Sequence, residues 1–155
     1  MSPRRFGRHH LRKFGYRFTE PRVAIFNILN TTNEHLSVDE IYEKIKNQYP
    51  GIGRATIYRT LDLLQKLNVV LKFDFGENLS RYELTEEYSN KNHHHHLICK
   101  TCNNIYDYFD FIDVEVNLIQ KLEKKLSQKF NFEIDNHRIE FYGLCDKCKK
   151  NNIKR

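Results

Sequence analysis

The chain has 155 residues, of which 39% are hydrophobic and 30% are charged, and its formal net charge is +6. This length and composition are typical of one large or two small globular domains whose cores form without disulfides. No apolar run approaches the roughly 20 residues of a membrane span, and no apolar segment follows the basic N-terminus as in a secretory signal. The sequence therefore predicts a cytoplasmic protein that does not cross a membrane.

The positive charge is concentrated at the N-terminus. Residues 1–22 contain seven arginines and lysines and one glutamate, so their net charge of +6 equals that of the whole chain. A basic end on an otherwise balanced chain indicates a polyanionic partner, of which nucleic acid is the commonest. The alternative is that residues 1–10 form a solubilising or disordered basic arm.

The first half of the chain predicts helices followed by a hairpin. Residues 19–21 are typical of a helix start, and Ser37-Val38-Asp39-Glu40 has the spacing of a capping box before a second helix. A third helix is predicted from about residue 54 to 67, because apolar residues recur on one face at Ile57, Leu61, Leu64 and Leu67.

Alternating apolar and polar residues then predict strands over 71–75 and 81–84, joined by a turn. Helices followed by a two-stranded hairpin predict a winged helix-turn-helix, whose last helix enters the major groove of DNA. Other small α+β domains share this order of elements, so the pattern alone leaves them open.

A polar, turn-rich stretch at 87–92 predicts a hinge. After it we expect strands over 94–100 and 104–109, an amphipathic helix over 114–126 and a last strand region over 130–142. The expected fold class is α+β, with a winged-helix DNA-binding domain at 1–86 and an α/β dimerisation domain at 93–155. The apolar side of the helix at 114–126 carries Leu118, Ile119, Leu122 and Leu126. This half of the chain has much apolar surface for its size, which favours a homodimer.

The four cysteines form two Cys-x-x-Cys pairs, Cys99 with Cys102 and Cys145 with Cys148. Two such pairs supply the four thiolates of a closed, tetrahedral structural zinc site, which would attach the end of the chain to the first strands of its domain. Two unrelated reduced pairs, or a redox dithiol, are the alternative.

The only low-complexity tract is a run of four histidines, residues 93–96. On a strand, alternation places His94 and His96 on one face and His93 and His95 on the other, so one segment supplies two metal sites. Imidazole and carboxylate ligands without thiolate favour Fe²⁺, Mn²⁺ or Zn²⁺. A solvated polyhistidine loop that binds metals weakly is the alternative.

Six segments resemble signatures of the ferric uptake regulator (Fur) family, in the family's order from about residue 11 to residue 148. They are residues 15–22, 35–42, 55–61, 93–102, 136–138 and 142–148. The resemblance implies a metal-dependent, DNA-binding transcriptional repressor that is not an enzyme. It further implies a homodimer, a double-stranded, A/T-rich inverted-repeat operator, and ferrous iron as the signal in iron-uptake regulation.

The resemblance also assigns residues to sites. The regulatory site between the domains matches His35, Glu83, His94, His96 and Asp107. A second site in the dimerisation domain matches His93, His95, Glu115 and His137, where Glu115 requires a one-residue insertion after Asp110. The predicted DNA-binding residues are Arg17 at the minor groove and, on the recognition helix, Arg54, Thr56, Tyr58 and Arg59.

The implied metals are structural Zn²⁺ and regulatory Fe²⁺ or Mn²⁺, with Zn²⁺ a candidate at the regulatory and second sites. His95 stands where iron-sensing members often have Asp, which shifts the second site towards zinc. Asp107 stands where iron sensors tend to have Glu and the peroxide-sensing branch has Asp, so a PerR-type repressor using Fe²⁺ or Mn²⁺ is one alternative. A zinc-uptake regulator is another, although such members often have a regulatory cysteine that this chain lacks.

Three other classes of protein fit the sequence less well. A metallohydrolase needs an open coordination position and a substrate pocket, and no motif marks a nucleophile or a phosphate-binding loop. A metal-storage protein or metal chaperone would explain the histidines but not the winged-helix pattern. Metal-independent DNA binding by a zinc-stapled dimer is the more serious rival.

Overall fold

The computed structural model describes residues 15–17, 19–32, 34–76, 79–89 and 91–152. The predicted basic arm at 1–10 lies outside this set. The chain divides into two compact units, residues 1–90 and 91–155. In the described part of the chain, no helix is both long and apolar enough to cross a bilayer.

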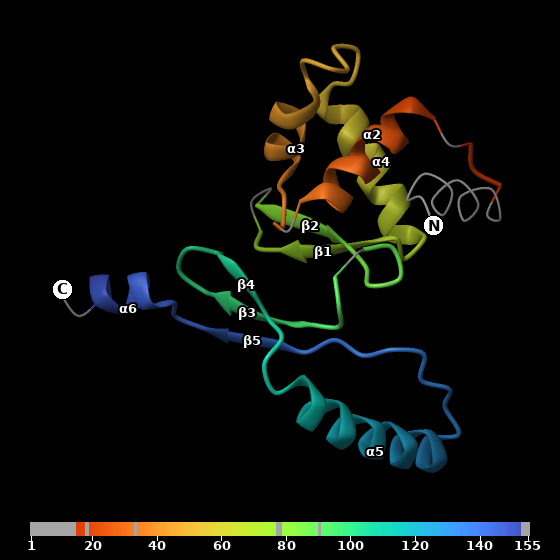
Figure 1. Ribbon diagram of the computed structural model, residues 1–155, viewed down its shortest axis with the longest axis vertical. Coiled ribbons are helices and arrows are strands. Elements are labelled where there is room, and N and C mark those ends of the chain that lie inside the picture. The colour runs from red at the N-terminus through yellow and green to blue at the C-terminus, as the bar shows by residue number, and fades with distance from the viewer. Residues whose placement is uncertain (1–14, 18, 33, 77–78, 90, 153–155) are drawn as a thin grey trace. The chain divides into compact units, whose positions relative to one another are not determined.

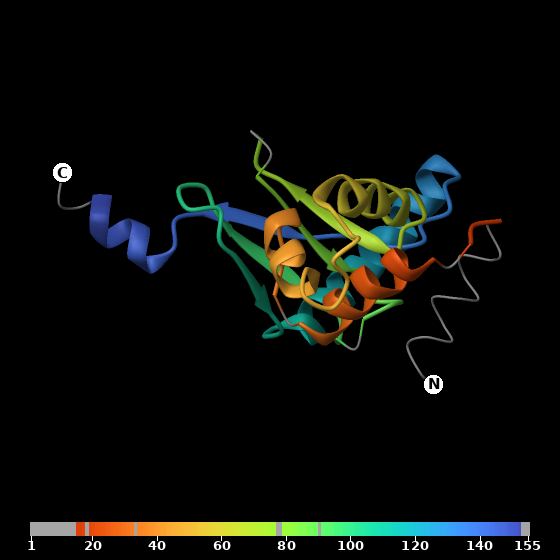
Figure 2. The same cartoon turned by 90° about the horizontal axis from the view of Figure 1, so that it is seen from above.

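Among the residues that the structure describes, the first unit has three helices and a two-stranded antiparallel hairpin (Figure 1). The helices lie on one side of the hairpin, and Figure 2 shows the same arrangement from above. Their order, helices and then hairpin, is the order predicted from the sequence. The elements are α2 (Glu20–Thr31), α3 (Val38–Ile45), α4 (Arg54–Lys66), β1 (Val70–Asp74) and β2 (Ser80–Leu84).

One continuous apolar core holds the first unit together. All three helices and both strands contribute side chains that are 2% exposed or less: Ile25, Ile41, Ile45, Ile57, Leu61, Val70 and Tyr82. Three of the four apolar residues that predicted α4 are buried in it, and Leu67 packs against it from the side.

The segment before α3 is fixed at both of its ends. The predicted capping box is present: Ser37 Oγ accepts from the Glu40 N–H, and the Glu40 carboxylate accepts from the Ser37 N–H at 2.7 Å. Immediately before it, Leu36 forms an antiparallel bridge with Tyr82 of β2. The chain preceding α3 is therefore attached to the hairpin by a single β-bridge.

In the second unit, the described residues form a three-stranded sheet and two helices. Its strands are ordered β4–β3–β5, with β3 antiparallel to β4 and parallel to β5. The elements are β3 (His95–Cys99), β4 (Ile105–Tyr108), α5 (Ile112–Phe130), β5 (Glu140–Gly143) and α6 (Asp146–Asn152). In both views α6 extends beyond the end of the sheet (Figures 1 and 2).

The prediction of a last strand region over 130–142 is wrong for most of its length. Helix α5 continues to Phe130 and ends at Asn131, which has a left-handed backbone. Residues 132–139 form no strand, and β5 begins only at Glu140. The reason is the length of its partner: β3 begins at His95, so residues before 139 have no neighbouring strand to pair with.

Helix α5 exposes its apolar face. Its contacts with the rest of the unit include a hydrogen bond that Glu115 accepts from the Tyr108 hydroxyl and a hydrogen bond between Glu123 and His137 Nδ1. Apolar side chains at four-residue steps, between 37% and 70% exposed, form a stripe along the helix: Val114, Leu118, Leu122, Leu126 and Phe130. We call these five residues the α5 stripe.

Candidate metal centres and nucleic-acid interface

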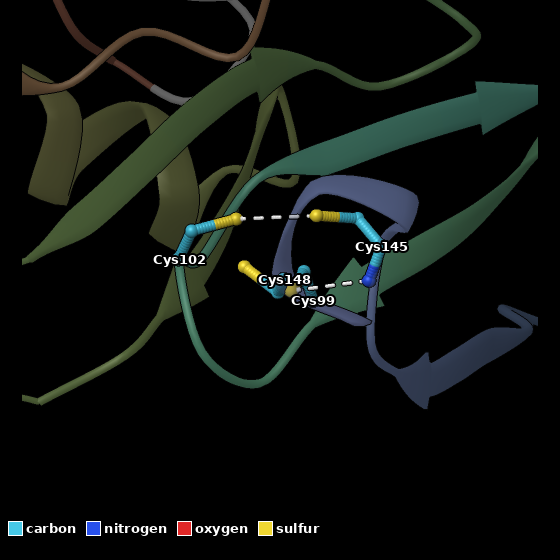
Figure 3. Close-up of side chains that lie close together, drawn as sticks. All are labelled: Cys99, Cys102, Cys145 and Cys148. Carbon is cyan, nitrogen blue, oxygen red and sulfur yellow. Dashed lines mark hydrogen bonds between the residues drawn. The ribbon is translucent and has the colours of Figure 1, made fainter. Parts of the chain in front are cut away.

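The four cysteines gather between the β3–β4 turn and the start of α6 (Figure 3). Their sulfur atoms all lie within 4.8 Å of one another, and the Sγ atoms of Cys102 and Cys145 are 3.8 Å apart. This is the separation of about 3.8 Å expected between two thiolates that bind one zinc ion tetrahedrally at about 2.3 Å. It is far longer than a disulfide bond, and all four cysteines are free.

The electrostatics of the cluster also fit a divalent cation. Backbone N–H groups, first that of Cys145, point at Cys99 and lower the pKa of its thiol to about 6. The neighbouring Cys145 thiol and burial raise the pKa of Cys148 to about 12. Four sulfurs this close do not all ionise alone, because their charges repel. A bound Zn²⁺ would supply the positive charge that stabilises four thiolates.

In the first unit, a histidine and a carboxylate lie side by side. The bridge between Leu36 and Tyr82 is antiparallel, so the next residues on either side, His35 and Glu83, also lie opposite each other. His35 Nε2 is 3.3 Å from Glu83 Oε2, which is close to the separation of two ligands of one metal ion. The ring of Phe73 packs edge-on against His35.

Arg81 and Glu40 hold this pair in place, a role that no pattern in the sequence indicates. Arg81 Nη1 donates to the backbone oxygen of His35 at 2.6 Å and to Glu40 Oε2 at 3.0 Å. Burial alone would raise the pKa of Glu40, but hydrogen bonds from Ser37 and the charge of Arg81 keep that pKa below its usual value. The arginine thus connects β2 to the start of α3 and to the backbone of His35.

In the second unit, a second set of such ligands lies on one face of the sheet. His96 and Asp107 are direct partners in the β3–β4 ladder, and His96 Nε2 is 3.7 Å from Asp107 Oδ1. His94 Nε2 is 3.9 Å from Asp107 Oδ2, and His94 Nδ1 lies 3.0 Å from the backbone oxygen of Asn92. The Lys91 ammonium is 2.6 Å from the same Asp107 oxygen, so a cation already pairs with this carboxylate.

A third cluster, also in the second unit, contains three histidines. His93, His95 and His137 each offer a ring nitrogen, and these three atoms lie within 4.8 Å of one another. The ring centroids of His93 and His95 are 4.7 Å apart, and that of His137 is 5.3 Å from His93. As alternation predicts, His95 is paired in the ladder one residue before His96, so the two face opposite ways.

Two glutamates of α5 reach the three-histidine cluster. Glu115 Oε2 is 3.3 Å from His95 Nε2, and the Glu115 carboxylate accepts a hydrogen bond from the Tyr108 hydroxyl at 3.1 Å. Burial and this carboxylate raise the pKa of Tyr108 to about 12, so the hydroxyl remains a donor. Glu123, which no motif in the sequence marks, lies with its Oε1 atom 2.9 Å from His137 Nδ1.

Most of the predicted DNA-binding residues are exposed. Arg54, Tyr58 and Arg59 of α4 are exposed, and the side chain of Thr56 is half-buried. Arg54 pairs with Asp39 of α3 and lies 4.2 Å over the ring of Tyr42. Arg17 is exposed before α2. The outer side of α4 therefore presents basic and aromatic side chains that suit contacts with phosphates and bases.

Replacing one zinc ligand tests the four-cysteine cluster. We expect Cys148→Ser to lose one equivalent of zinc, measured by elemental analysis of the purified chain. Bound zinc at 1,000 times its dissociation constant stabilises a fold by about 4 kcal/mol. Faster amide hydrogen exchange in β3, β5 and α6 should therefore accompany the loss. The exposed Thr101→Ser in the same turn is the control, and an unchanged zinc content in Cys148→Ser would contradict the assignment.

The sequence model of the ferric uptake regulator family matches residues 13–142. The ferric uptake regulation protein of Bacillus subtilis is 37% identical over 139 residues, 89% of each chain. The peroxide-responsive repressor PerR of Staphylococcus aureus is 33% identical over 138 residues, 89% of this chain and 86% of that protein.

Among solved structures, the Vibrio cholerae ferric uptake regulator, described with DNA-binding domains, is 28% identical. The matched region covers 90% of this chain and 99% of the Vibrio cholerae chain, and the TM-score is 0.63. The α+β fold with an N-terminal winged helix and a C-terminal dimerisation domain is thereby confirmed. This chain belongs to the ferric uptake regulator family.

Proposed function

We propose that this protein is a metal-dependent transcriptional repressor that senses ferrous iron and regulates iron uptake. One observation carries the proposal: each unit holds a histidine opposite a carboxylate through its own backbone pairing, His35 with Glu83 and His96 with Asp107. Family membership and the relative named as a ferric uptake regulation protein support the same signal.

The regulatory metal would be held by ligands from both units. His35 and Glu83 would supply one side, and His94, His96 and Asp107 the other. Imidazole and carboxylate ligands suit Fe²⁺ and Mn²⁺, while Zn²⁺ is a candidate here and at the second site. Ligands that precede residues 87–92 in the chain and ligands that follow them would bind the same metal ion. The paired backbones keep each half-set in position, so occupancy would favour one inter-unit angle.

That angle would control binding to double-stranded DNA. In a homodimer two α4 helices must lie about 34 Å apart to enter successive major grooves of an A/T-rich inverted repeat. The exposed Arg54, Tyr58 and Arg59 would contact phosphates and bases, with Arg17 reaching the minor groove. A coupling of about 1–3 kcal/mol between metal and DNA would change operator affinity roughly 5- to 150-fold.

The α5 stripe supports the homodimer. Five large apolar side chains in a row along an exposed helix exceed the scattered apolar residues of a monomer's surface. On the sheet, Leu97 and Phe141 are adjacent in the β3–β5 ladder and are 44% and 51% exposed. A second copy that covers these residues would bury them by the hydrophobic effect.

Asp107 favours one second candidate, a peroxide-sensing repressor that uses Fe²⁺ or Mn²⁺. An aspartate at this position resembles the peroxide-sensing branch, and a PerR of Staphylococcus aureus is among the similar proteins. Such a protein would lose its Fe²⁺ response after peroxide and keep its Mn²⁺ response. A zinc-uptake regulator is the third candidate.

Removing one imidazole of the regulatory set tests the sensing function. His96→Ala removes the ring beside Asp107, so we expect metal-dependent operator binding to weaken by at least tenfold, measured by fluorescence anisotropy at fixed salt. The variant should keep its structural zinc and its dimeric state, because His96 belongs neither to the four-cysteine cluster nor to the α5 stripe.

Gln120→Ala, an exposed and uncharged change on α5, is the control and should bind like the unmodified chain. Operator affinity in His96→Ala equal to that of this control would contradict metal sensing. It would support metal-independent DNA binding by a zinc-stapled dimer instead.

A charge in the α5 stripe tests the homodimer. Leu118 is 67% exposed, so Leu118→Glu should be harmless to an isolated subunit and should disfavour a dimer in which the residue is buried. Light scattering after size-exclusion chromatography should show a shift from dimer to monomer at micromolar concentration. If Leu118→Glu remains fully dimeric, the stripe is not the interface.

A further inference from the structure

We propose that Glu123 is a positioning residue of the second metal site, which holds the His137 ring so that its Nε2 atom faces the other ligands. The inference rests on the second site of the proposed function. Glu123 lies eight residues after Glu115 on α5, outside the set of ligands that the sequence predicts. Its role follows from which nitrogen of His137 it contacts.

The two ring nitrogens of His137 have different surroundings. Nδ1 lies 2.9 Å from Glu123 Oε1, and both side chains are about one-quarter exposed. Nε2 is buried and has no hydrogen-bond partner among the residues that the structure describes. The His137 ring centroid is 5.3 Å from that of His93 and 5.7 Å from that of His95. One nitrogen is thus attached to α5, and the other is buried in a group of imidazoles.

This arrangement fixes the tautomer of His137. An ionised carboxylate only accepts hydrogen bonds, so Nδ1 must carry the proton that it donates to Glu123. Nε2 of the neutral ring then carries a lone pair, which is the form that binds a metal ion. A histidine ligand whose other nitrogen donates to a carboxylate is held in orientation and is a stronger base.

The two glutamates of α5 therefore have different roles. Glu115 Oε2 lies 3.3 Å from His95 Nε2, which is about the separation of two ligands on one small ion, so Glu115 fits a direct ligand. Glu123 contacts Nδ1 of His137 and leaves the buried Nε2 as the nitrogen available to the cluster, so it acts through the ring. Both residues are half-buried on the same side of α5, about 12 Å apart along the helix.

The competing account is an ordinary surface ion pair between Glu123 and a protonated His137. That account places a second proton on Nε2, a donor that is buried beside two other imidazoles without an acceptor among the described residues. Burying an unsatisfied charged donor is costly. It also predicts that Glu123 has no effect on metal binding, and this difference makes the two accounts separable.

The experiment measures zinc binding to the second site of the full-length chain. Structural zinc is retained, and all variants carry His96→Ala so that the regulatory set does not compete. Zn²⁺ is titrated anaerobically against a chromogenic chelator. The variants are Glu123→Gln, Glu123→Ala, Glu115→Gln and His137→Ala, and the exposed Glu133→Gln serves as a matched control.

We expect Glu123→Gln, which keeps an acceptor and loses the charge, to weaken zinc binding about tenfold, and Glu123→Ala to approach 100-fold. Glu133→Gln should bind like the parent. Long-range ¹H–¹⁵N spectra of the imidazoles should show one His137 tautomer with its proton on Nδ1. In Glu123→Ala that preference should be lost. Glu123→Gln preserves side-chain volume, so it carries the test if Glu123→Ala does not fold.

Two results overturn the proposal, and they differ. If both Glu123 variants bind zinc like the parent while His137→Ala does not, the second site stands and Glu123 does not position its ligand. If His137→Ala also binds like the parent, the second site itself is wrong, and the role of Glu123 is wrong with it.

Discussion

The register of two short antiparallel pairings decides which side chains of this protein face one another. In the first unit, the bridge between the segment before α3 and β2 places His35 opposite Glu83. In the second, the β3–β4 ladder places His96 opposite Asp107. A slip of one residue would turn each side chain to the other face and leave no ligand pair. The hydrogen bonds of Arg81 and the capping box of α3 resist that slip in the first unit.

The two units are stabilised by different means. The first has a continuous apolar core built from all of its elements. In the described part of the second unit, the buried apolar side chains are Ile98, Cys99 and Cys148, while many of its large apolar residues are exposed. So small a core needs additional stabilisation from metal ions or from association. The four-cysteine cluster, the three-histidine cluster and the α5 stripe are the features that would supply it, which connects metal binding to dimerisation.

Much of this was predictable from local patterns, and the exceptions share one cause. The capping box at Ser37 and the buried face of α4 follow from short-range spacing. The two Cys-x-x-Cys pairs predict that the four cysteines lie together in one zinc site. The contact between Glu123 and His137 had no such signal, because a glutamate on an amphipathic helix is ordinarily solvated. Its position depends on where residues 132–139 run after α5 ends. The false strand region over 130–142 has the same origin, since its extent is set by the length of β3.

The central claim is that a metal ion held by histidines and carboxylates controls DNA binding. The most direct measurement is an anaerobic anisotropy titration of an A/T-rich inverted-repeat operator at fixed salt. It starts from protein that contains only structural zinc, adds Fe²⁺, Mn²⁺ or Zn²⁺ separately, and ends with a brief peroxide pulse. Tight binding that requires Fe²⁺ or Mn²⁺ and survives peroxide is the result expected of an iron sensor, and loss of the Fe²⁺ form alone identifies a peroxide sensor. Equally tight binding without added metal would contradict the account.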